Sequence, residues 1–429
     1  MWSGSAEVPD IGDAPRKESL SVHEAGAQVY GWRSLYFSKV RRFLATRHLA
    51  WHLLTRGQFR DLHNLVYTKV LVPGGEGTAK AAFPVWGPLV RGFPALAPFP
   101  RYVEIEVTTI CDKDCVFCEH THWPLDAQER RNLKYEEFVH IVDQFPTLRW
   151  ANLTGEGSSF LNRDYPRMLR YLRERHHTSI YLVDHFSDVN EETIRLLVDI
   201  GINGVYLSID GATAQTYERI KVGCKWDNVV TNIRRLIAYK RQKRTPLPEL
   251  CFRFVITHDN VHEMPAFVDF VNALGTPADL GYTAQINFTG LLHFPEIEHM
   301  FVRELPREVV DGLQARRGKG VPVVLDHAVA ELLPPPHCCE CWLEPYIMMG
   351  GYVLPCCGVL MSNKRPFLRQ HAFGNVLQGD MKEIWNSPRY RAFRRMLMNP
   401  KAPVPIMCAG CRAFNTTPRM KRYGVSREI

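Results

Sequence analysis

Three cysteines stand close together in the segment Cys111-Asp-Lys-Asp-Cys115-Val-Phe-Cys118. A β-rich run precedes this segment, so we expect the thiols on a loop at the C-terminal end of a strand. Three thiolates on one loop can bind a cubane iron–sulfur cluster and leave one iron open to a substrate or cofactor ligand. A Cys₃His zinc site, completed by His120 or His122, is the alternative. The position at the end of a strand favours the cluster.

A second group of cysteines lies near the end of the sequence and comprises Cys338, Cys339, Cys341, Cys356, Cys357, Cys408 and Cys411. Within it, Cys341 and Cys356 belong to a CX9GX4C pattern, and Cys408-Ala-Gly-Cys411 is a CX2C pair. Four thiolates satisfy a whole cubane and leave no open iron. They equally satisfy a Cys₄ zinc site. We predict the ligands Cys341, Cys356, Cys408 and Cys411, with Cys338 and Cys339 as alternatives to Cys341, and assign no role to Cys357.

The sequence after Tyr102 alternates short β-rich runs with helical patterns, and these elements must position the first cysteine group. The expected strands span 102–108, 150–154, 179–184, 205–210, 251–257 and 281–288. The expected helices span 135–145, 165–175, 191–199, 228–240 and 261–274. This alternation predicts an α/β fold with a parallel sheet, curled or open, whose ligands gather at the C-terminal ends of the strands.

Capping residues support several of these boundaries. Asn190 and Asn260 are predicted N-caps, and Glu263 follows Asn260 at the spacing of a capping box. Gly201 and Gly275 are predicted to follow the last turns of their helices, where a left-handed backbone favours glycine.

The N-terminal part of the chain has a different pattern. Residues 1–25 are polar and expected to be mobile, whereas the pattern from Tyr30 to Lys69 is helical, with arginines between apolar residues. A stretch interrupted by proline and glycine, from Pro84 to Pro100, is expected to be a linker. A basic amphipathic helix can lie on a membrane surface or pack against the main domain. We favour packing and keep peripheral membrane contact as the alternative.

Composition excludes several classes of protein. A hydrophobic fraction of 45% with 29 glycines and 29 prolines is ordinary for a globular protein. The sequence has no apolar run of about 18 residues and no N-terminal signal peptide, so we predict a cytoplasmic protein. Its twelve cysteines then indicate metal or redox chemistry, not six disulfides. A net charge of +8 is modest, and the basic run 240–244 is interpreted as a solvated helix end, so a nucleic-acid partner is not expected.

The first cysteine group resembles the CX3CX2C signature of radical S-adenosylmethionine (radical SAM) enzymes, and Phe117 fits the aromatic position before the third cysteine. Further segments, between 102 and 288, agree with this family. Leu153–Asn162 is similar to the Gly-Glu-Pro segment, with Gly157 where proline is usual. Leu207–Gly211 is similar to the ribose-contacting segment, and Arg253–Glu263 to the segment of the fifth strand. In contrast, Val183-Asp184-His185 replaces the Thr-Asn-Gly that often ends the third strand.

The resemblance implies a role for each of these residues. It assigns a [4Fe-4S] cluster, whose open iron chelates SAM, to Cys111, Cys115 and Cys118. Glu156 would accept a hydrogen bond from the methionine ammonium, and Ser208 and Asp210 would face the ribose. Lys221 stands where many relatives carry an arginine toward the methionine carboxylate, and a lysine there lacks the bidentate fork. Phe117 completes the expected cofactor contacts.

The second cysteine group resembles the SPASM/twitch extension of radical SAM enzymes, as do Gly374-Asn375-Val376 and Glu383-Ile384-Trp385-Asn386. No cysteine follows Cys411, which implies the shorter form with one auxiliary [4Fe-4S] cluster. The expected architecture is a partial (β/α)6 TIM-like barrel at 99–325. An N-terminal helical extension and Pro-rich linker occupy 1–98, and a SPASM/twitch-type domain occupies 326–429.

The resemblance also implies an enzyme that reductively cleaves SAM to a 5′-deoxyadenosyl radical, which abstracts a hydrogen atom from the substrate. We expect oxidation or epimerisation of a carbohydrate, lipid-linked or other small metabolite, with electrons from a partner such as flavodoxin or ferredoxin. A ribosomally made peptide is the alternative. It is disfavoured because 1–98 lack the strand pattern of a winged-helix leader-binding domain. A non-catalytic zinc or iron–sulfur scaffold is a third hypothesis.

Two cysteines remain outside both groups. Cys224 lies in the loop after the fourth expected strand, where a thiol can return a hydrogen atom to a substrate radical. An inert loop cysteine is the alternative, since reactivity depends on exposure and surroundings. Cys251 begins an expected strand at the opposite end of the barrel and is predicted to be a core residue.

Overall fold

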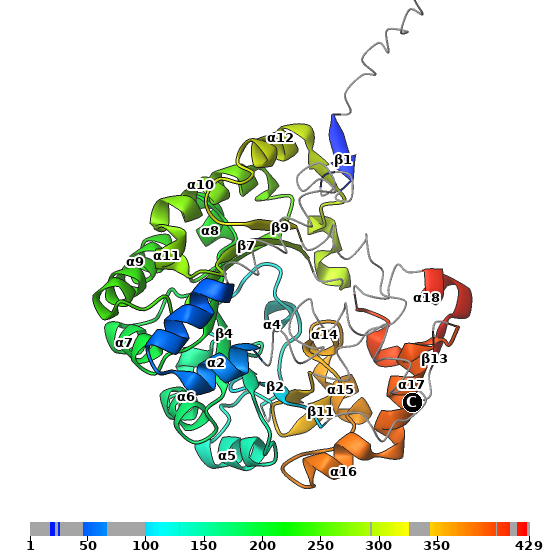
Figure 1. Cartoon of the computed structure of the whole chain (residues 1–429). Coiled ribbons are helices and arrows are strands. Elements are labelled where there is room, and N and C mark those ends of the chain that lie inside the picture. The colour runs from blue at the N-terminus through cyan, green and yellow to red at the C-terminus, as the bar shows by residue number, and fades with distance from the viewer. Residues whose placement is uncertain are drawn as a thin grey trace, which may run out of the picture.

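The structure is a computed structural model that describes residues 18–21, 25, 46–66, 99–127, 129–291, 294–325, 344–399, 401–411 and 418–426. A nine-stranded sheet in the order β11-β10-β2-β3-β4-β5-β6-β7-β9 forms its frame (Figure 1). The central strands are β2 (Tyr102–Ile105), β3 (Trp150–Leu153), β4 (Ser179–Asp184), β5 (Gly204–Ser208), β6 (Glu249–Ile256) and β7 (Gln285–Gly290). Each pairs in parallel with the next. The six predicted strands and the α/β fold are therefore confirmed.

The helices between these strands also follow the prediction. They are α5 (Tyr135–Asp143), α6 (Tyr165–Glu174), α7 (Glu191–Asp199), α9 (Trp226–Lys243) and α10 (Met264–Leu274). Each buries an apolar stripe at helical spacing; on α5 it consists of Phe138, Ile141 and Val142. A further helix, α8 (Ala214–Ile220), precedes α9 and was not predicted.

Short elements complete the barrel. They are α4 (Glu119–His122), η3 (Ser159–Leu161), η4 (Val261–Glu263), α11 (Pro277–Leu280), η5 (Pro295–Met300), β8 (Glu304–Pro306), α12 (Arg307–Ala315) and β9 (Val323–Leu325). β9 pairs in parallel with β7 and extends the sheet at that edge.

Two of the four capping predictions are correct. The side chain of Asn190 accepts a hydrogen bond from the Thr193 N–H at 2.8 Å, and Gly201 has a φ of +70°. The prediction for Asn260 was right in position, since Asn260 directly precedes η4, but wrong in the bond: Oδ1 accepts from the Thr257 N–H and Nδ2 donates to the Asp210 carbonyl. The prediction for Gly275 was also wrong, since its φ of 172° is extended backbone.

An N-terminal helical hairpin covers the starts of the central strands. Residues 46–55 are helical, and α2 (Phe59–Val66) follows after a turn. Leu49 and Leu53 pack on Leu247, which precedes β6. For residues 46–66 the predicted packing against the main domain is confirmed. The rest of the expected helix and most of the linker lie outside the described residues.

The polar N-terminal segment contains an element that the sequence did not predict. Residues Ser19–Ser21 form β1, which pairs antiparallel with β8 through Ser19↔Pro306 and Ser21↔Glu304. Its partner lies far along the chain, so the expectation of a mobile segment was wrong at these residues.

The C-terminal region is built onto the barrel sheet. β10 (Tyr346–Met348) pairs in parallel with β2, and β11 (Tyr352–Leu354) forms a hairpin with it. Then follow α14 (Cys357–Leu360), α15 (Arg365–His371), α16 (Met381–Asn386), α17 (Pro388–Met398), β12 (Val404–Pro405), η7 (Ile406–Cys408), α18 (Pro418–Tyr423) and β13 (Val425–Ser426). In Figure 1 this orange-to-red region lies beside the β2 edge.

Candidate cofactor and iron–sulfur site

The loop with the first cysteine group leaves the C-terminal end of β2, as predicted. Cys111, Cys115 and Cys118 are partly exposed, and α4 begins directly after Cys118. Burial raises the pKa of all three thiols above the ordinary value. The thiols therefore carry their protons at neutral pH until a metal displaces them.

Neighbouring segments hold this loop in place. The Asp114 N–H donates to the Val222 carbonyl at 3.0 Å, which aligns the loop with the chain after α8. The buried Lys113 places its Nζ 2.8 Å from a carboxylate oxygen of Asp188, in the loop after β4. The cysteine loop is thus anchored to the loops that follow β4 and β5.

Both histidines of the zinc alternative bind backbone carbonyls. Nε2 of His120 lies 3.1 Å from the Thr109 oxygen, and Nε2 of His122 lies 2.8 Å from the Val116 oxygen. Within the described ranges, no three Cys, His, Asp or Glu side chains gather closely enough to hold a metal ion. This holds for a Cys₃His site and for the three thiols of the cluster alike, and what disfavours the zinc alternative is that both histidines are engaged with the backbone.

Three of the five predicted cofactor residues, Ser208, Asp210 and Phe117, lie around the ammonium group of a fourth, Lys221. Lys221 Nζ donates to Ser208 Oγ at 2.8 Å, lies 2.9 Å from Asp210 Oδ2, and stands 5.4 Å from the ring centroid of Phe117. Burial disfavours the charged lysine, but Asp210 outweighs this effect and holds the pKa of Lys221 above its ordinary value. The Lys221–Asp210 ion pair lies beside the cysteine loop, because the ring of Phe117 in that loop stands next to the ammonium group.

Asp210 is fixed from two sides. The Val255 N–H donates to Asp210 Oδ1 at 2.6 Å, and Asn260 Nδ2 donates to the Asp210 carbonyl at 3.0 Å. Its side chain is fully buried. Asp210 therefore positions Lys221 in this structure, and its contact with a ribose stays a prediction.

The fifth predicted residue, Glu156, lies in a separate buried charge cluster. Arg365, on α15, donates from Nε to Glu156 Oε2 at 2.9 Å. The same guanidinium donates from Nη1 to Glu106 Oε2 at 3.0 Å and from Nη2 to Glu106 Oε1. Burial raises the pKa of Glu156 to about 8, although the neighbouring Arg365 opposes the shift. A third carboxyl group nearby, Glu119, also has its pKa raised by burial.

The sequence did not predict roles for Glu106 and Arg365. A signal for Glu106 was present, because a carboxylate alternates there with the apolar Ile105 and Val107 of a buried strand, and such a charge requires a partner. No local signal marks Arg365.

Close backbone contact explains the glycine that replaces the family's usual proline. A Cβ on Gly157 would lie 2.7 Å from the carbonyl oxygens of both Thr108 and Ile110. Cβ atoms essentially never approach other atoms that closely. The loop after β3 can therefore lie this close to the cysteine loop only with glycine at this position.

Cys224 is a core residue in the loop between α8 and α9. Its side chain is 1% exposed, and burial raises its pKa to about 12. Its thiol is therefore protonated at neutral pH, which is the form that can give a hydrogen atom. The role of hydrogen donor stays a prediction. Cys251, 9% exposed, is a core residue, as predicted.

Two described members of the second group, Cys356 and Cys411, lie near each other. A Cβ on Gly358 would lie 3.7 Å from the sulfurs of both Cys356 and Cys411, so these two sulfurs are at most twice that distance apart. The Cys411 N–H donates to the Cys408 carbonyl at 3.1 Å. No disulfide joins the cysteines within the described ranges. Cys338, Cys339 and Cys341 lie outside those ranges, so the first auxiliary ligand is still open.

Comparison with known families identifies two regions of the chain. Residues 105–271 match the radical SAM superfamily, and residues 338–412 match SPASM, an iron–sulfur cluster-binding domain. The tungsten-containing aldehyde ferredoxin oxidoreductase cofactor-modifying protein of Pyrococcus furiosus is 23% identical over 354 residues, which cover 74% of this chain and 90% of that protein.

Solved structures agree in fold. SuiB of Streptococcus suis bound to S-adenosylmethionine has a TM-score of 0.54 at 15% identity, over 84% of this chain and 81% of SuiB. SuiB bound to the precursor peptide SuiA has a TM-score of 0.53 at 16% identity, over 79% of this chain and 74% of SuiB. The structure of anSMEcpe with bound AdoMet has a TM-score of 0.50 at 14% identity, over 77% of this chain and 88% of anSMEcpe. These structures confirm the expected fold. The two family matches confirm the C-terminal iron–sulfur domain and the SAM and [4Fe-4S] cofactors expected from the sequence.

Proposed function

This chain is a radical SAM enzyme with a C-terminal SPASM domain, and from that premise we propose that it removes a hydrogen atom from a small-molecule substrate. The observation that carries the proposal is the convergence, at the C-terminal edge of the parallel sheet, of the cysteine loop with the Lys221 cluster, through the Phe117 ring and the Asp114 N–H bond to Val222. Ligands of such sheets bind at this edge.

The donor set suits the cofactors. We assign the SAM-binding cluster to Cys111, Cys115 and Cys118, which are three thiols on one loop. When bound, the cluster and SAM supply the electron and the 5′-deoxyadenosyl radical that abstracts hydrogen. Lys221 has the charge to hold the methionine carboxylate, and Glu156, once deprotonated, has the charge to hold the methionine ammonium.

The remaining cysteines are assigned to later steps. We propose Cys341, Cys356, Cys408 and Cys411 as ligands of one auxiliary [4Fe-4S] cluster. That cluster can accept an electron when the substrate is oxidised, and a flavodoxin or ferredoxin is the class of reductant that starts the reaction. If the substrate is epimerised, Cys224 is our candidate for the hydrogen donor.

A small molecule is the first choice of substrate because the relative from Pyrococcus furiosus, matched over 90% of its length, is named for modifying a cofactor. Carbohydrates and lipid-linked metabolites belong to the same proposal. A ribosomally made peptide is the second candidate, because SuiB shares the fold and was solved with a precursor peptide.

Cofactor cleavage tests the proposal. The reconstituted protein, reduced with dithionite, should convert SAM to 5′-deoxyadenosine and methionine. Cys115→Ala should abolish this product, whereas Cys251→Ala, the same change at a core cysteine of β6, should retain it. Full cleavage by Cys115→Ala would refute the cluster assignment. A substrate panel of small metabolites and of peptides then separates the two classes by which of them stimulates cleavage.

A further inference from the structure

Exposed apolar side chains are concentrated on the N-terminal hairpin, residues 46–66. In the part of the chain that the structure describes, six large hydrophobic residues are exposed, and four lie on this hairpin. They are Trp51, Leu54, Phe59 and Val66, with 66%, 44%, 64% and 39% of their surface exposed. Single exposed hydrophobic residues are ordinary, but a group of them on one element marks an interaction surface.

The inner face of the hairpin fixes the orientation of this outer face. Leu62 and Leu65 join the apolar contacts of the hairpin with the barrel. The buried Asp61 receives two hydrogen bonds from Arg173 of α6, at 2.6 and 2.9 Å. The exposed residues therefore belong to helices that are firmly attached to the barrel.

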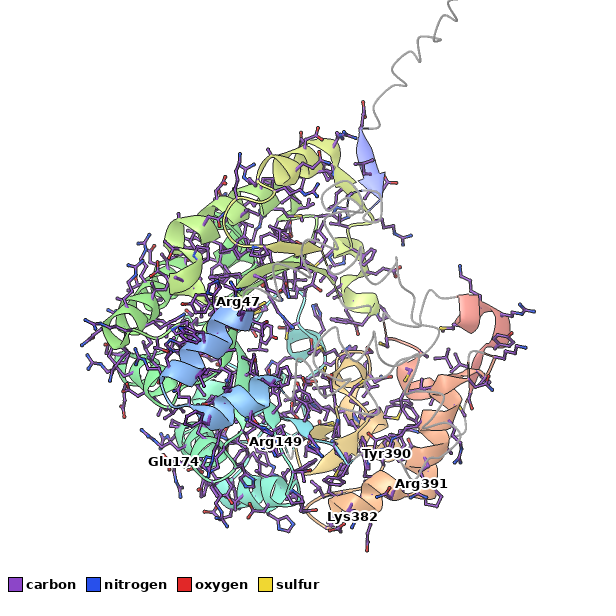
Figure 2. All side chains as sticks on the ribbon, viewed as in Figure 1. Arg47, Arg149, Glu174, Lys382, Tyr390 and Arg391 are labelled. Carbon is purple, nitrogen blue, oxygen red and sulfur yellow. The ribbon has the colours of Figure 1, made fainter. Side chains whose placement is uncertain are left out.

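The exposed charges on the hairpin are all positive. Its exposed charged residues are Arg47, Arg56 and Arg60, and Figure 2 shows Arg47 at the start of the first helix. Asp61 is the sole carboxylate in the sequence 46–66, and it is used in the Arg173 pair. Arg56 extends the basic surface to the end of α9, where its Nη2 donates to the Arg244 carbonyl at 2.9 Å.

We propose that the outer face of the 46–66 hairpin binds an anionic lipid surface. Trp51, Leu54 and Phe59 would enter the boundary between headgroups and acyl chains, where tryptophan and apolar residues are favoured. Arg47 and Arg56 would lie among the lipid phosphates, which attract basic residues near a membrane. The proposed contact is peripheral, with the hairpin lying at the bilayer surface. No helix in the described ranges has the length and apolar character to cross a bilayer.

The position of the hairpin determines which side of the enzyme faces the membrane. The hairpin packs on Leu247 and Tyr282, which precede β6 and β7, at the starts of the strands. The cysteine loop follows the other end of β2. A membrane-bound molecule therefore turns its cysteine loop away from the bilayer. The contact of the hairpin with lipid holds the enzyme at the membrane surface. This inference does not depend on the proposed function.

Vesicle co-sedimentation of the full chain tests the inference. We expect binding to phosphatidylcholine vesicles that contain phosphatidylglycerol, and at least tenfold weaker binding to phosphatidylcholine alone. The double variant Trp51→Glu/Phe59→Glu should lose at least tenfold in affinity for the anionic vesicles, and so should Arg47→Ser/Arg56→Ser/Arg60→Ser.

Matched controls separate the hairpin from general charge and hydrophobicity. Val425→Glu changes an exposed valine elsewhere, and Arg195→Ser/Arg219→Ser/Arg303→Ser removes three exposed arginines from other elements. Both should bind vesicles like the unchanged protein, and all variants should keep its circular dichroism spectrum. Absence of anionic binding, or equal losses in controls and hairpin variants, would overturn the inference. A dimer that Trp51→Glu/Phe59→Glu dissociates, without vesicle binding, would also overturn it and assign the face to a second copy.

Discussion

Nε of Arg365 lies 2.9 Å from Oε2 of Glu156, so a helix of the C-terminal region holds the residue that we assign to the cofactor ammonium. The same guanidinium binds Glu106, next to the cysteine loop. The C-terminal region therefore does more than carry its own cysteines, because it fixes the position of a barrel carboxyl group 209 residues earlier in the sequence.

Replacing Arg365 should destabilise the protein strongly. Arg365→Met leaves the buried Glu106 without its guanidinium and removes a hydrogen bond to Glu156. Breaking a buried ion pair costs roughly 3–5 kcal/mol. Arg303→Met is the control, because its exposed ion pair with Glu298 should contribute about 1 kcal/mol at most. Urea unfolding of the metal-free proteins measures both. Equal losses in the two variants would contradict the assigned role, and adding Glu106→Gln to Arg365→Met should restore part of the stability.

Glu156 should make stability depend on pH. Its pKa rises from 4.5 to about 8 in the folded protein, so the native state keeps a proton that the unfolded chain releases between these values. Because the native state binds more protons there, the free energy of unfolding should fall as pH rises from 4.5 to 8 and then level off. Glu156→Gln should remove this part of the slope. The free energy of unfolding of both proteins, measured from pH 5 to 9, checks this prediction. Identical slopes of that free energy against pH would show that Glu156 does not titrate in this range.

Gly157 should not tolerate a side chain. Gly157→Ala puts a methyl group 2.7 Å from the carbonyl oxygens of Thr108 and Ile110, and such overpacking costs about 1–3 kcal/mol. Because Ile110 precedes the first cysteine, iron incorporation should fall as well. Gly379→Ala is the control, since the nearest atom there is at an ordinary 3.7 Å. Iron content and thermal unfolding of the two variants should differ clearly, and similar values would contradict the close contact.

Cys224 should control hydrogen return if the enzyme epimerises its substrate. Turnover in deuterated water should then place deuterium in the product, because a protonated thiol exchanges with solvent. Cys224→Ala should stop this labelling while 5′-deoxyadenosine still forms, and Cys251→Ala should leave it unchanged. An unlabelled, oxidised product from the unchanged enzyme would indicate a dehydrogenase instead.

The sequence predicted features that depend on local spacing. The cysteine loop follows β2, and α7 begins at its Asn190 cap, because these signals lie within a few residues. The contact between Glu106 and Arg365 spans 259 residues, and the pairing of β10 with β2 is similarly remote. In neither pair does the sequence around one member indicate which distant residue or strand is its partner. Asn260 shows a further limit, since its Oδ1, the atom that would cap a helix, accepts from the Thr257 N–H instead, and its Nδ2 donates to the distant Asp210 carbonyl.

The most direct test of this account is the iron and acid-labile sulfide content after anaerobic reconstitution. Two cubanes predict about eight of each per chain. Cys115→Ala should reduce both to about four, and Cys408→Ala should do the same through the second group. Zinc in place of iron, or an iron content of about four that Cys115→Ala does not change, would contradict the assignment of a SAM-binding cluster to the first cysteine group.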